Sequence, residues 1–240
     1  MKLEKDERIE DLECKGLKII QNKNLYTFTS DSVILANYIK TKRNDKLIEI
    51  GSGCGVISIL LTEKTNFEKI TAFEIQKELA LLTEKNIKLN NLEDKIEIIN
   101  DDVKNWQKHA KNEKFDIVFS NPPYMSEDVL NQNSVKAKAR HDETLDIDSL
   151  CKISSAMLKE GGKLYLVYGA PRSAELISKL VENKLEPKEM FFTENGKGKT
   201  VLFVVMAVKG GKHGVKVLPN LVTNDQNGDY IEKLHTRNFV

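Results

Sequence analysis

The tetrapeptide Asn121-Pro122-Pro123-Tyr124 follows directly on an apolar run, 115–120, with the composition of a buried strand. Proline has no backbone N–H to give to a sheet, so the chain must leave the sheet here. The Asn121 side-chain oxygen and the Pro122 backbone oxygen are two acceptors that a stiff turn can aim at the two hydrogens of a planar amino group. Such an amine is a poor nucleophile because its lone pair is delocalised, and two acceptors favour the pyramidal form. Tyr124 can stack on the flat group, so we predict catalysis by positioning and electrostatics. The tetrapeptide alone is also compatible with a strand exit in which Asn121 caps the turn.

A glycine-rich turn follows an earlier apolar run, 46–50, and contains Gly51, Gly53 and Gly55. Glycine lets the backbone turn sharply and lets a ligand approach closely, and the helix start that follows offers free N–H groups. The spacing is neither the G-x-G-x-x-G of dinucleotide sites nor that of a P-loop. By itself the turn is equally compatible with a generic connection between a strand and a helix.

Acidic residues end the next two strand-like runs. A carboxylate at Glu74 can accept hydrogen bonds from both hydroxyls of a ribose. Asp101 or Asp102, after the third run, could accept from the exocyclic amine of an adenine. The glycine turn and these acids together indicate a ligand that contains a nucleoside.

From residue 46 onward, short β-rich runs alternate with helical patterns, which predicts a doubly wound, mostly parallel α/β sheet. The end of the chain differs, because two strand-like runs flank Asn195-Gly196, a strong signal for an antiparallel hairpin. Residues 1–45 are predicted to be an N-terminal extension with a helix capped by Ser30 or Asp31, and residues 46–240 to be the main domain.

The composition argues against a membrane-spanning protein, a disulfide-bonded protein and a metal-binding protein. The 240 residues carry a net charge of +1, contain no apolar stretch long enough to span a membrane, and hold three widely spaced cysteines. We therefore expect a cytoplasmic monomer without a disulfide or a bound metal. Five lysines and no acid occupy residues 195–216, which predicts either a surface for phosphates or a solvated face.

The run from Glu49 to Gly53 and the acids that follow resemble the class I S-adenosylmethionine-dependent methyltransferases over residues 46–208. Asn-Pro-Pro-Tyr is typical of members that methylate planar nitrogens: adenine N6, guanine N2 of ribosomal RNA, or a glutamine of release factors. The segments 26–39, 135–167, 185–192, 201–225 and 228–234 resemble the tRNA(1)(Val) adenine-37 N6-methyltransferase family. This second resemblance covers nearly the whole chain from Gln21.

The resemblance implies a Rossmann-like fold with a seven-stranded, mostly parallel sheet and a C-terminal antiparallel hairpin. It also implies transfer of a methyl group from S-adenosylmethionine to an adenine of tRNA, held by the residues 121–124. The residues expected at the cofactor are Thr29, Asp31, Glu49, Gly51, Gly53, Gly55, Glu74, Asp101, Asp102 and Asn121. Those expected at the RNA are Lys136, Lys138, Arg140, Lys209 and Lys212. The alternatives are a release-factor glutamine methyltransferase, a ribosomal RNA guanine methyltransferase, and an RNA-binding module with a vestigial fold.

Overall fold

The computed structural model describes residues 3–25, 27–110, 113–123 and 145–224. The large sheet contains β3 (Lys46–Ile50), β4 (Lys69–Phe73), β5 (Ile96–Ile99), β6 (Phe115–Ser120), β7 (Leu158–Gly169), β8 (Leu185–Glu194), β9 (Thr200–Lys209), β10 (Lys216–Val217) and β11 (Leu221–Val222). The helices are α1 (Ser30–Tyr38), α2 (Val56–Lys64), α3 (Lys77–Leu89), α4 (Trp106–Ala110), α6 (Ile147–Met157) and α7 (Ser173–Glu182). A separate hairpin is formed by β1 (Glu7–Asp11) and β2 (Lys18–Asn22).

The predicted doubly wound α/β fold is confirmed. The strand order is β10-β8-β9-β7-β6-β3-β4-β5, and β11 also pairs with β8. All neighbouring strands are parallel except β9, which is antiparallel to both β7 and β8. Within the described residues the sheet has nine strands rather than the expected seven, because the chain after β9 turns back and adds two short strands, β10 and β11, along the edge of β8.

Side chains alternate between the two faces of the sheet, and each face buries its own core. In β3, Leu47 packs with the first core cluster and Ile48 with the second. The first cluster joins the sheet to α1, α2, α3 and the β1–β2 hairpin, whereas the second joins it to α4, α6 and α7. Because both faces are covered by helices, the parallel strands are apolar on both sides, as the runs in the sequence indicate.

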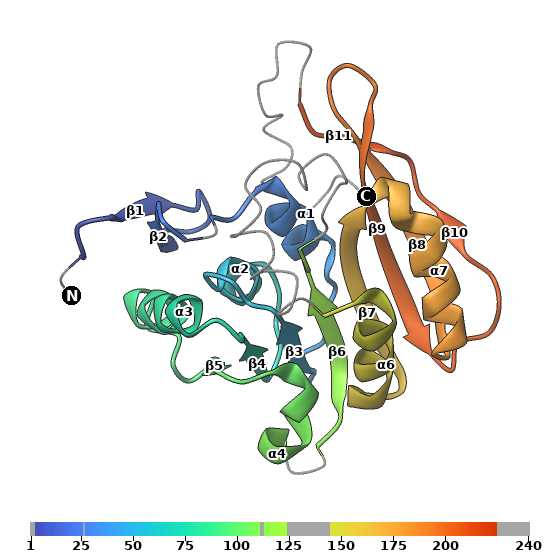
Figure 1. Cartoon of the computed structure of the whole chain (residues 1–240), viewed down its shortest axis with the longest axis horizontal. Coiled ribbons are helices and arrows are strands. Elements are labelled where there is room, and N and C mark those ends of the chain that lie inside the picture. Colours follow the sequence, from blue (N-terminus) through green and yellow to red (C-terminus); the bar gives the residue numbers. More distant parts are fainter. Residues whose placement is uncertain (1–2, 26, 111–112, 124–144, 225–240) are drawn as a thin grey trace.

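Two edges of the sheet differ in what they carry. The carboxyl edge is where β3, β4, β5, β6 and β7 end, and it lies toward the top of Figure 1, near α1 and the tip of the β8–β9 hairpin. The amino edge, where these strands begin, is at the opposite end. Ligands of open α/β sheets bind at the carboxyl edge. None of the described helices is long and apolar enough to cross a membrane.

Helix α1 begins one residue earlier than the sequence suggests. Its N-cap is Thr29, which makes no side-chain capping bond, and Ser30 and Asp31 form the first turn. The predicted caps are therefore wrong. Ser30 Oγ donates to Asp31 Oδ1 at 3.3 Å, and the Asp31 carboxylate lies where the helix dipole favours negative charge.

Candidate functional site

The site lies where two central strands end side by side. Strands β3 and β6 are parallel neighbours, and Ile50 pairs with Ser120 in their register. Ser120 Oγ donates to the Ile50 carbonyl at 2.6 Å and joins the two strand ends. Gly51 and Asn121 therefore leave the sheet next to each other. The chain runs outward from β3 to β5 and then returns to β6 on the other side, so this is the topological switch point of the sheet.

Asn121 is half-buried and its side chain is anchored to α1. Its Nδ2 donates to Oγ of Ser32 at 3.1 Å, and Ser32 is 4 % exposed. This contact turns the Asn121 carbonyl oxygen away from Ser32 and leaves it available as an acceptor. Pro122 is buried and Pro123 is exposed. Tyr124 lies outside the described residues.

The glycines of this turn allow its backbone conformation, the approach of a ligand and the close packing of α3. Gly51, Gly53 and Gly55 have φ values of 73°, 58° and 83°, in the left-handed region that favours glycine. A Cβ at Gly51 would meet no atom within 4 Å, so the backbone there faces open space that a ligand can approach. A Cβ at Gly55 would lie 2.8 Å from Thr83 Cγ2, so Gly55 lets α3 pack closely.

Glu49 ends up under this turn rather than in solvent. It is 1 % exposed, and burial raises the pKa of its carboxyl group to about 8 despite a hydrogen bond from Ser58 Oγ to Oε2. Glu49 Oε1 and the buried Ser52 Oγ have no hydrogen-bond partner within the described part of the chain. Two polar atoms on either side of Gly51 thus fit a ligand with a polar head, such as the amino-acid end of S-adenosylmethionine.

The Glu74 carboxylate connects the glycine turn to α3. Its Oε2 accepts from Gly53 N at 2.8 Å, and its Oε1 accepts from Gln76 N at 2.9 Å. Glu74 is 5 % exposed at the end of β4, the strand beside β3. The carboxylate is therefore held beside the turn, and carboxylate oxygens are acceptors of the kind that ligand hydroxyls need.

The two aspartates after β5 have different surroundings. Asp101 Oδ2 lies 2.7 Å from His109 Nε2, and Oδ1 accepts from Asn105 Nδ2 and from the backbone N–H of Asp102. These bonds, chiefly the one to His109, lower the Asp101 pKa to about 2. Asp102 caps a 3₁₀ turn, Val103–Asn105, by accepting from Lys104 N with Oδ1. Asp101 is therefore engaged by its own loop, and Asp102 is the better candidate for an adenine contact.

Of the five residues predicted to contact RNA, the structure describes two. Lys136, Lys138 and Arg140 lie outside the described residues. Lys209 ends β9, which runs antiparallel to β7, so Lys209 lies at the amino edge and Lys212 beyond it. The structure does not bring these two lysines to the edge that carries Asn121.

Three residues that form hydrogen bonds to the site have no signal in the sequence: Ser32, Ser58 and Asn86. Ser32 reaches Asn121 across 89 positions of the chain, and Asn86 Nδ2 donates to the carbonyl of Cys54 in the glycine turn at 2.9 Å. Thr29 is exposed and Asp31 is half-buried, both at the start of α1. Across the described residues, no group of three or more His, Cys, Asp or Glu side chains could hold a metal ion.

Comparisons with known proteins agree with this site. Residues 26–190 match the family described as methyltransferase small domain. A tRNA1(Val) (adenine(37)-N6)-methyltransferase of Dyadobacter fermentans is 23% identical over 216 residues, covering 89% of either chain. Another of the same name, from Shewanella sediminis, is 26% identical and covers 72% of this chain and 71% of its own.

The fold is also shared with solved structures. A predicted O-methyltransferase from Agrobacterium tumefaciens superposes with a TM-score of 0.66 at 19% identity, over 86% of this chain and 96% of its own. The resemblance predicted from the motifs is confirmed, because the family match spans the glycine turn, the acids and Asn121. This chain belongs to the methyltransferase small domain family.

Proposed function

We propose that this protein transfers a methyl group from S-adenosylmethionine to the exocyclic N6 of an adenine in tRNA, at position 37 beside the anticodon of a valine tRNA. The nucleotide and its position come from the relatives, which carry that activity in their names. The similarity to them covers most of both chains, which supports a shared substrate.

The observation that carries the chemistry is the placement of Asn121. It lies next to the glycine turn, and Ser32 takes its amide N–H, so its carbonyl oxygen can accept from the amine of the base. The backbone oxygen of Pro122 is the second proposed acceptor. Attack of the nitrogen on the methyl group that the bound cofactor would supply would leave the cofactor as a neutral thioether and the nitrogen cationic. Two acceptors on its hydrogens stabilise that charge, and the proton then leaves to water.

The cofactor supplies an activated methyl group on a sulfonium ion. We propose that Gly51 and Gly53 allow its close approach, while Glu49 and Ser52 hold its amino-acid end. Glu74 would accept from the ribose hydroxyls and Asp102 from the adenine amine. Thr29 and Asp31, at the start of α1, would close over it.

The test is transfer of labelled methyl from S-adenosylmethionine to purified tRNA, ribosomal RNA and DNA, followed by nucleoside analysis. We expect N6-methyladenosine in the tRNA fraction. N2-methylguanosine in ribosomal RNA, or label only in release factor, would replace the proposed substrate by one of the two rival acceptors. The Asn121→Ala variant should bind the cofactor normally and lose at least about a hundredfold in methyl transfer. Label in no substrate, with normal cofactor binding, would leave an RNA-binding module.

A further inference from the structure

We infer that the tip of the β8–β9 hairpin, residues 195–199 with Lys197 and Lys199, is an arm that binds the RNA backbone away from the methylated base. The inference rests on the proposed function, because it assigns the surface that the tRNA would use. It divides the lysine-rich stretch 195–216 into two parts that lie at opposite edges of the sheet.

Strand register places the tip on the substrate side. Ser120 pairs with Leu166, and Leu166 pairs with Val205, so Val205 is level with the end of β6. Lys199 precedes Val205 by six residues, which is about 20 Å of strand beyond that level. Strand β9 is two places from β6, or about 10 Å sideways. The tip therefore lies roughly 20 Å from Asn121 and beyond the same carboxyl edge. In Figure 1 it is above the sheet.

Hydrogen bonds within the turn fix its backbone conformation. Asn195 Oδ1 accepts from the backbone N–H groups of Lys197 and Lys199 at 3.1 and 2.9 Å. Asn195 N donates to the Lys199 carbonyl at 3.0 Å, and Gly198 has a φ of 75°. Both lysines are exposed. A preformed turn presents its two ammonium groups with little loss of backbone entropy on binding.

The base of the hairpin is braced from the side. Thr223 N donates to the Glu194 carbonyl at 2.9 Å, and Leu202 N donates to Thr193 Oγ1 at 3.2 Å. The Glu194 carboxylate accepts from Asn220 Nδ2. The arm is thus a two-stranded extension of the sheet, held by Thr223 beside β8 and by the Leu202–Thr193 bond between its own strands.

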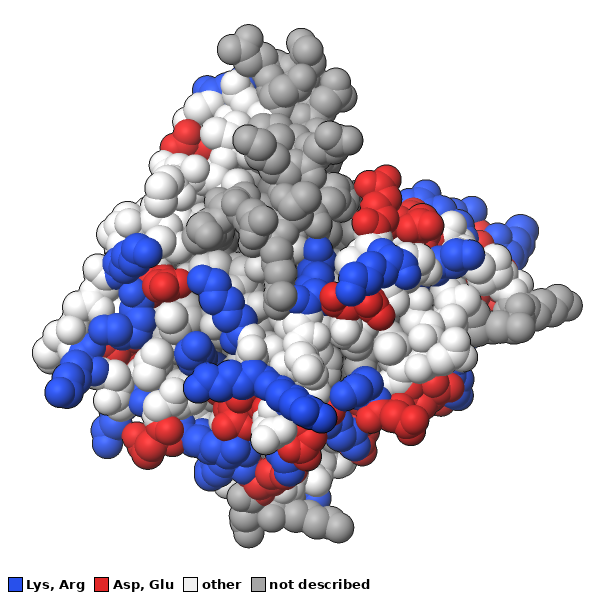
Figure 2. Space-filling view, turned by 180° about the vertical axis from the view of Figure 1, so that it is seen from behind, with Lys and Arg blue, Asp and Glu red and all other residues white. Residues whose placement is uncertain are grey.

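The lysines at the two edges differ in their partners. Lys209 Nζ donates to the Leu158 carbonyl at 3.0 Å and pairs with Glu160 at 3.5 Å, and its side chain is 18% exposed. Lys197 and Lys199 make no ion pair with any residue that the structure describes. Over the lower part of the face in Figure 2, blue and red side chains are interspersed, so that surface has no single charge. Free ammonium groups on a projecting turn suit a polyanionic chain such as an RNA backbone.

The experiment compares two charge reversals of equal size in the full-length protein. Lys197→Glu/Lys199→Glu changes the tip, and Lys42→Glu/Lys184→Glu changes two exposed lysines near the amino edge. The affinity for tRNA is measured by filter binding at several KCl concentrations, and cofactor affinity by calorimetry.

We expect the tip variant to bind tRNA about tenfold more weakly, with a salt slope smaller by about two, because two phosphate contacts are lost. Its cofactor affinity should match the wild type, and the control should bind tRNA within about twofold of the wild type. If the two variants bound tRNA with equal affinity and equal salt slope, the inference that the hairpin tip binds RNA would be overturned. A wild-type protein that does not bind tRNA would instead overturn the proposed substrate, so the two failures are distinguishable.

Discussion

The hydrogen bond between Asn121 and Ser32 joins the strand that carries the amine acceptor to the helix that we expect to cover the cofactor. Ser32 is buried in α1, and its Oγ lies 3.1 Å from Asn121 Nδ2. An asparagine side chain can rotate about its terminal bond, and one that offers N–H to the substrate amine would repel it. A fixed partner for the N–H group restricts the amide to the useful orientation. Ser32 is therefore a positioning residue.

Removing the Ser32 hydroxyl should lower kcat without weakening binding. For Ser32→Ala we expect a loss of about fivefold in kcat, equivalent to one hydrogen bond of roughly 1 kcal/mol. The KM for tRNA and the Kd for the cofactor should stay within twofold. Steady-state kinetics and calorimetry measure these quantities.

Two further variants separate positioning from general packing. Ser32→Thr keeps the hydroxyl and should retain most of the activity, whereas Asn121→Ala should lose at least about a hundredfold. If Ser32→Ala weakened cofactor binding as much as it lowered kcat, the hydroxyl would be holding the fold of α1 and not the amide.

The buried Glu49 carboxyl should make stability depend on pH. The pKa of this carboxyl group is about 8 in the folded protein, against an ordinary value of 4.5 for a glutamate side chain in water. Between these values the folded state holds a proton that the unfolded state has released, so the free energy of unfolding falls as the pH rises. One proton gives a slope of at most about 1.4 kcal/mol per pH unit.

Glu49→Gln removes this titration. The free energy of unfolding of the variant, relative to the wild type, should increase from pH 5 to pH 8 and then level off. Urea unfolding at each pH measures the difference, with exposed Glu93→Gln as the control. A difference that does not change with pH would mean that Glu49 is ionised in the folded state.

The β1–β2 hairpin is attached to α3 by two asparagines that act like an additional strand. Asn86 Oδ1 accepts from Ile20 N at 2.6 Å, and its Nδ2 donates to the Ile20 carbonyl at 3.0 Å. Asn90, one turn later, makes the same pair of bonds to Lys18. The free edge of β2 is thereby satisfied by side chains of a helix. Asn86 also holds Cys54, so the hairpin and the glycine turn share a partner.

Losing Asn86 should therefore affect both the hairpin and the cofactor. In Asn86→Ala the backbone groups of Ile20 and Cys54 lose their partners, at a cost of about 1–3 kcal/mol. We expect faster amide hydrogen exchange at Ile20 and a weaker cofactor affinity.

Asn90→Ala is the matched control, because it releases Lys18 but keeps the bond to Cys54. It should speed exchange at Lys18 alone and leave the cofactor affinity unchanged. Equal loss of affinity in both variants would show that the hairpin itself, and not Asn86, supports the turn.

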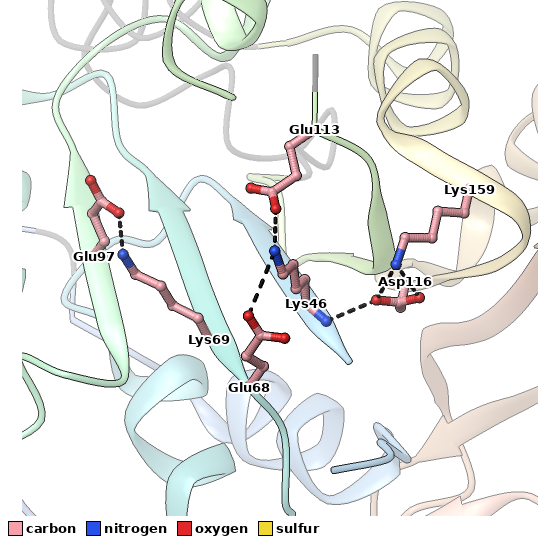
Figure 3. A network of polar contacts seen from close by, with 7 residues as sticks. All are labelled: Lys46, Glu68, Lys69, Glu97, Glu113, Asp116 and Lys159. Carbon is pink, nitrogen blue, oxygen red and sulfur yellow. Dashed lines mark hydrogen bonds and ion pairs between the residues drawn. The ribbon is translucent and has the colours of Figure 1, made fainter. Parts of the chain in front are cut away.

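The two edges of the sheet differ in role. Charged contacts that stabilise the fold lie at the amino edge, and the candidate site lies at the carboxyl edge. Figure 3 shows the amino edge, where Lys46 at the start of β3 lies between Glu68 and Glu113, and Lys69 pairs with Glu97. Asp116 in β6 accepts from the Lys46 backbone N–H at 2.9 Å and from Lys159 Nζ at 2.8 Å. This network links the beginnings of neighbouring strands, far from the carboxyl edge with Asn121.

Changes in this network should therefore alter stability and not ligand binding. Asp116→Ala leaves the Lys46 N–H without its acceptor, and we expect a loss of about 1–2 kcal/mol in the free energy of unfolding. Glu68→Ala, which removes an exposed ion pair at 3.6 Å, should cost less than about 0.5 kcal/mol. Urea unfolding and calorimetry with the cofactor measure the two effects. A weaker cofactor affinity in Asp116→Ala would contradict this separation.

The local pattern of the sequence was sufficient to predict the parallel α/β fold, the glycine turn and the Asn-Pro-Pro-Tyr segment at a strand end. These features depend on residues that are neighbours in the chain: apolar periodicity, glycines with positive φ, and prolines that end a strand. Because parallel strands end at one edge, the fold class alone places both segments at that edge of the sheet. The confirmed family resemblance rests on the same local motifs.

Only the tertiary structure decided which long-range partners each group has. Asn121 and Ser32 are 89 positions apart in the chain, yet the fold brings Asn121 Nδ2 within 3.1 Å of Ser32 Oγ. Lys199 and Lys209 lie at the two ends of β9, and because β9 is antiparallel to β7, Lys199 lies toward the carboxyl edge and Lys209 at the amino edge. Strand neighbours and side-chain partners depend on contacts between distant segments. No periodicity within either segment contains that information.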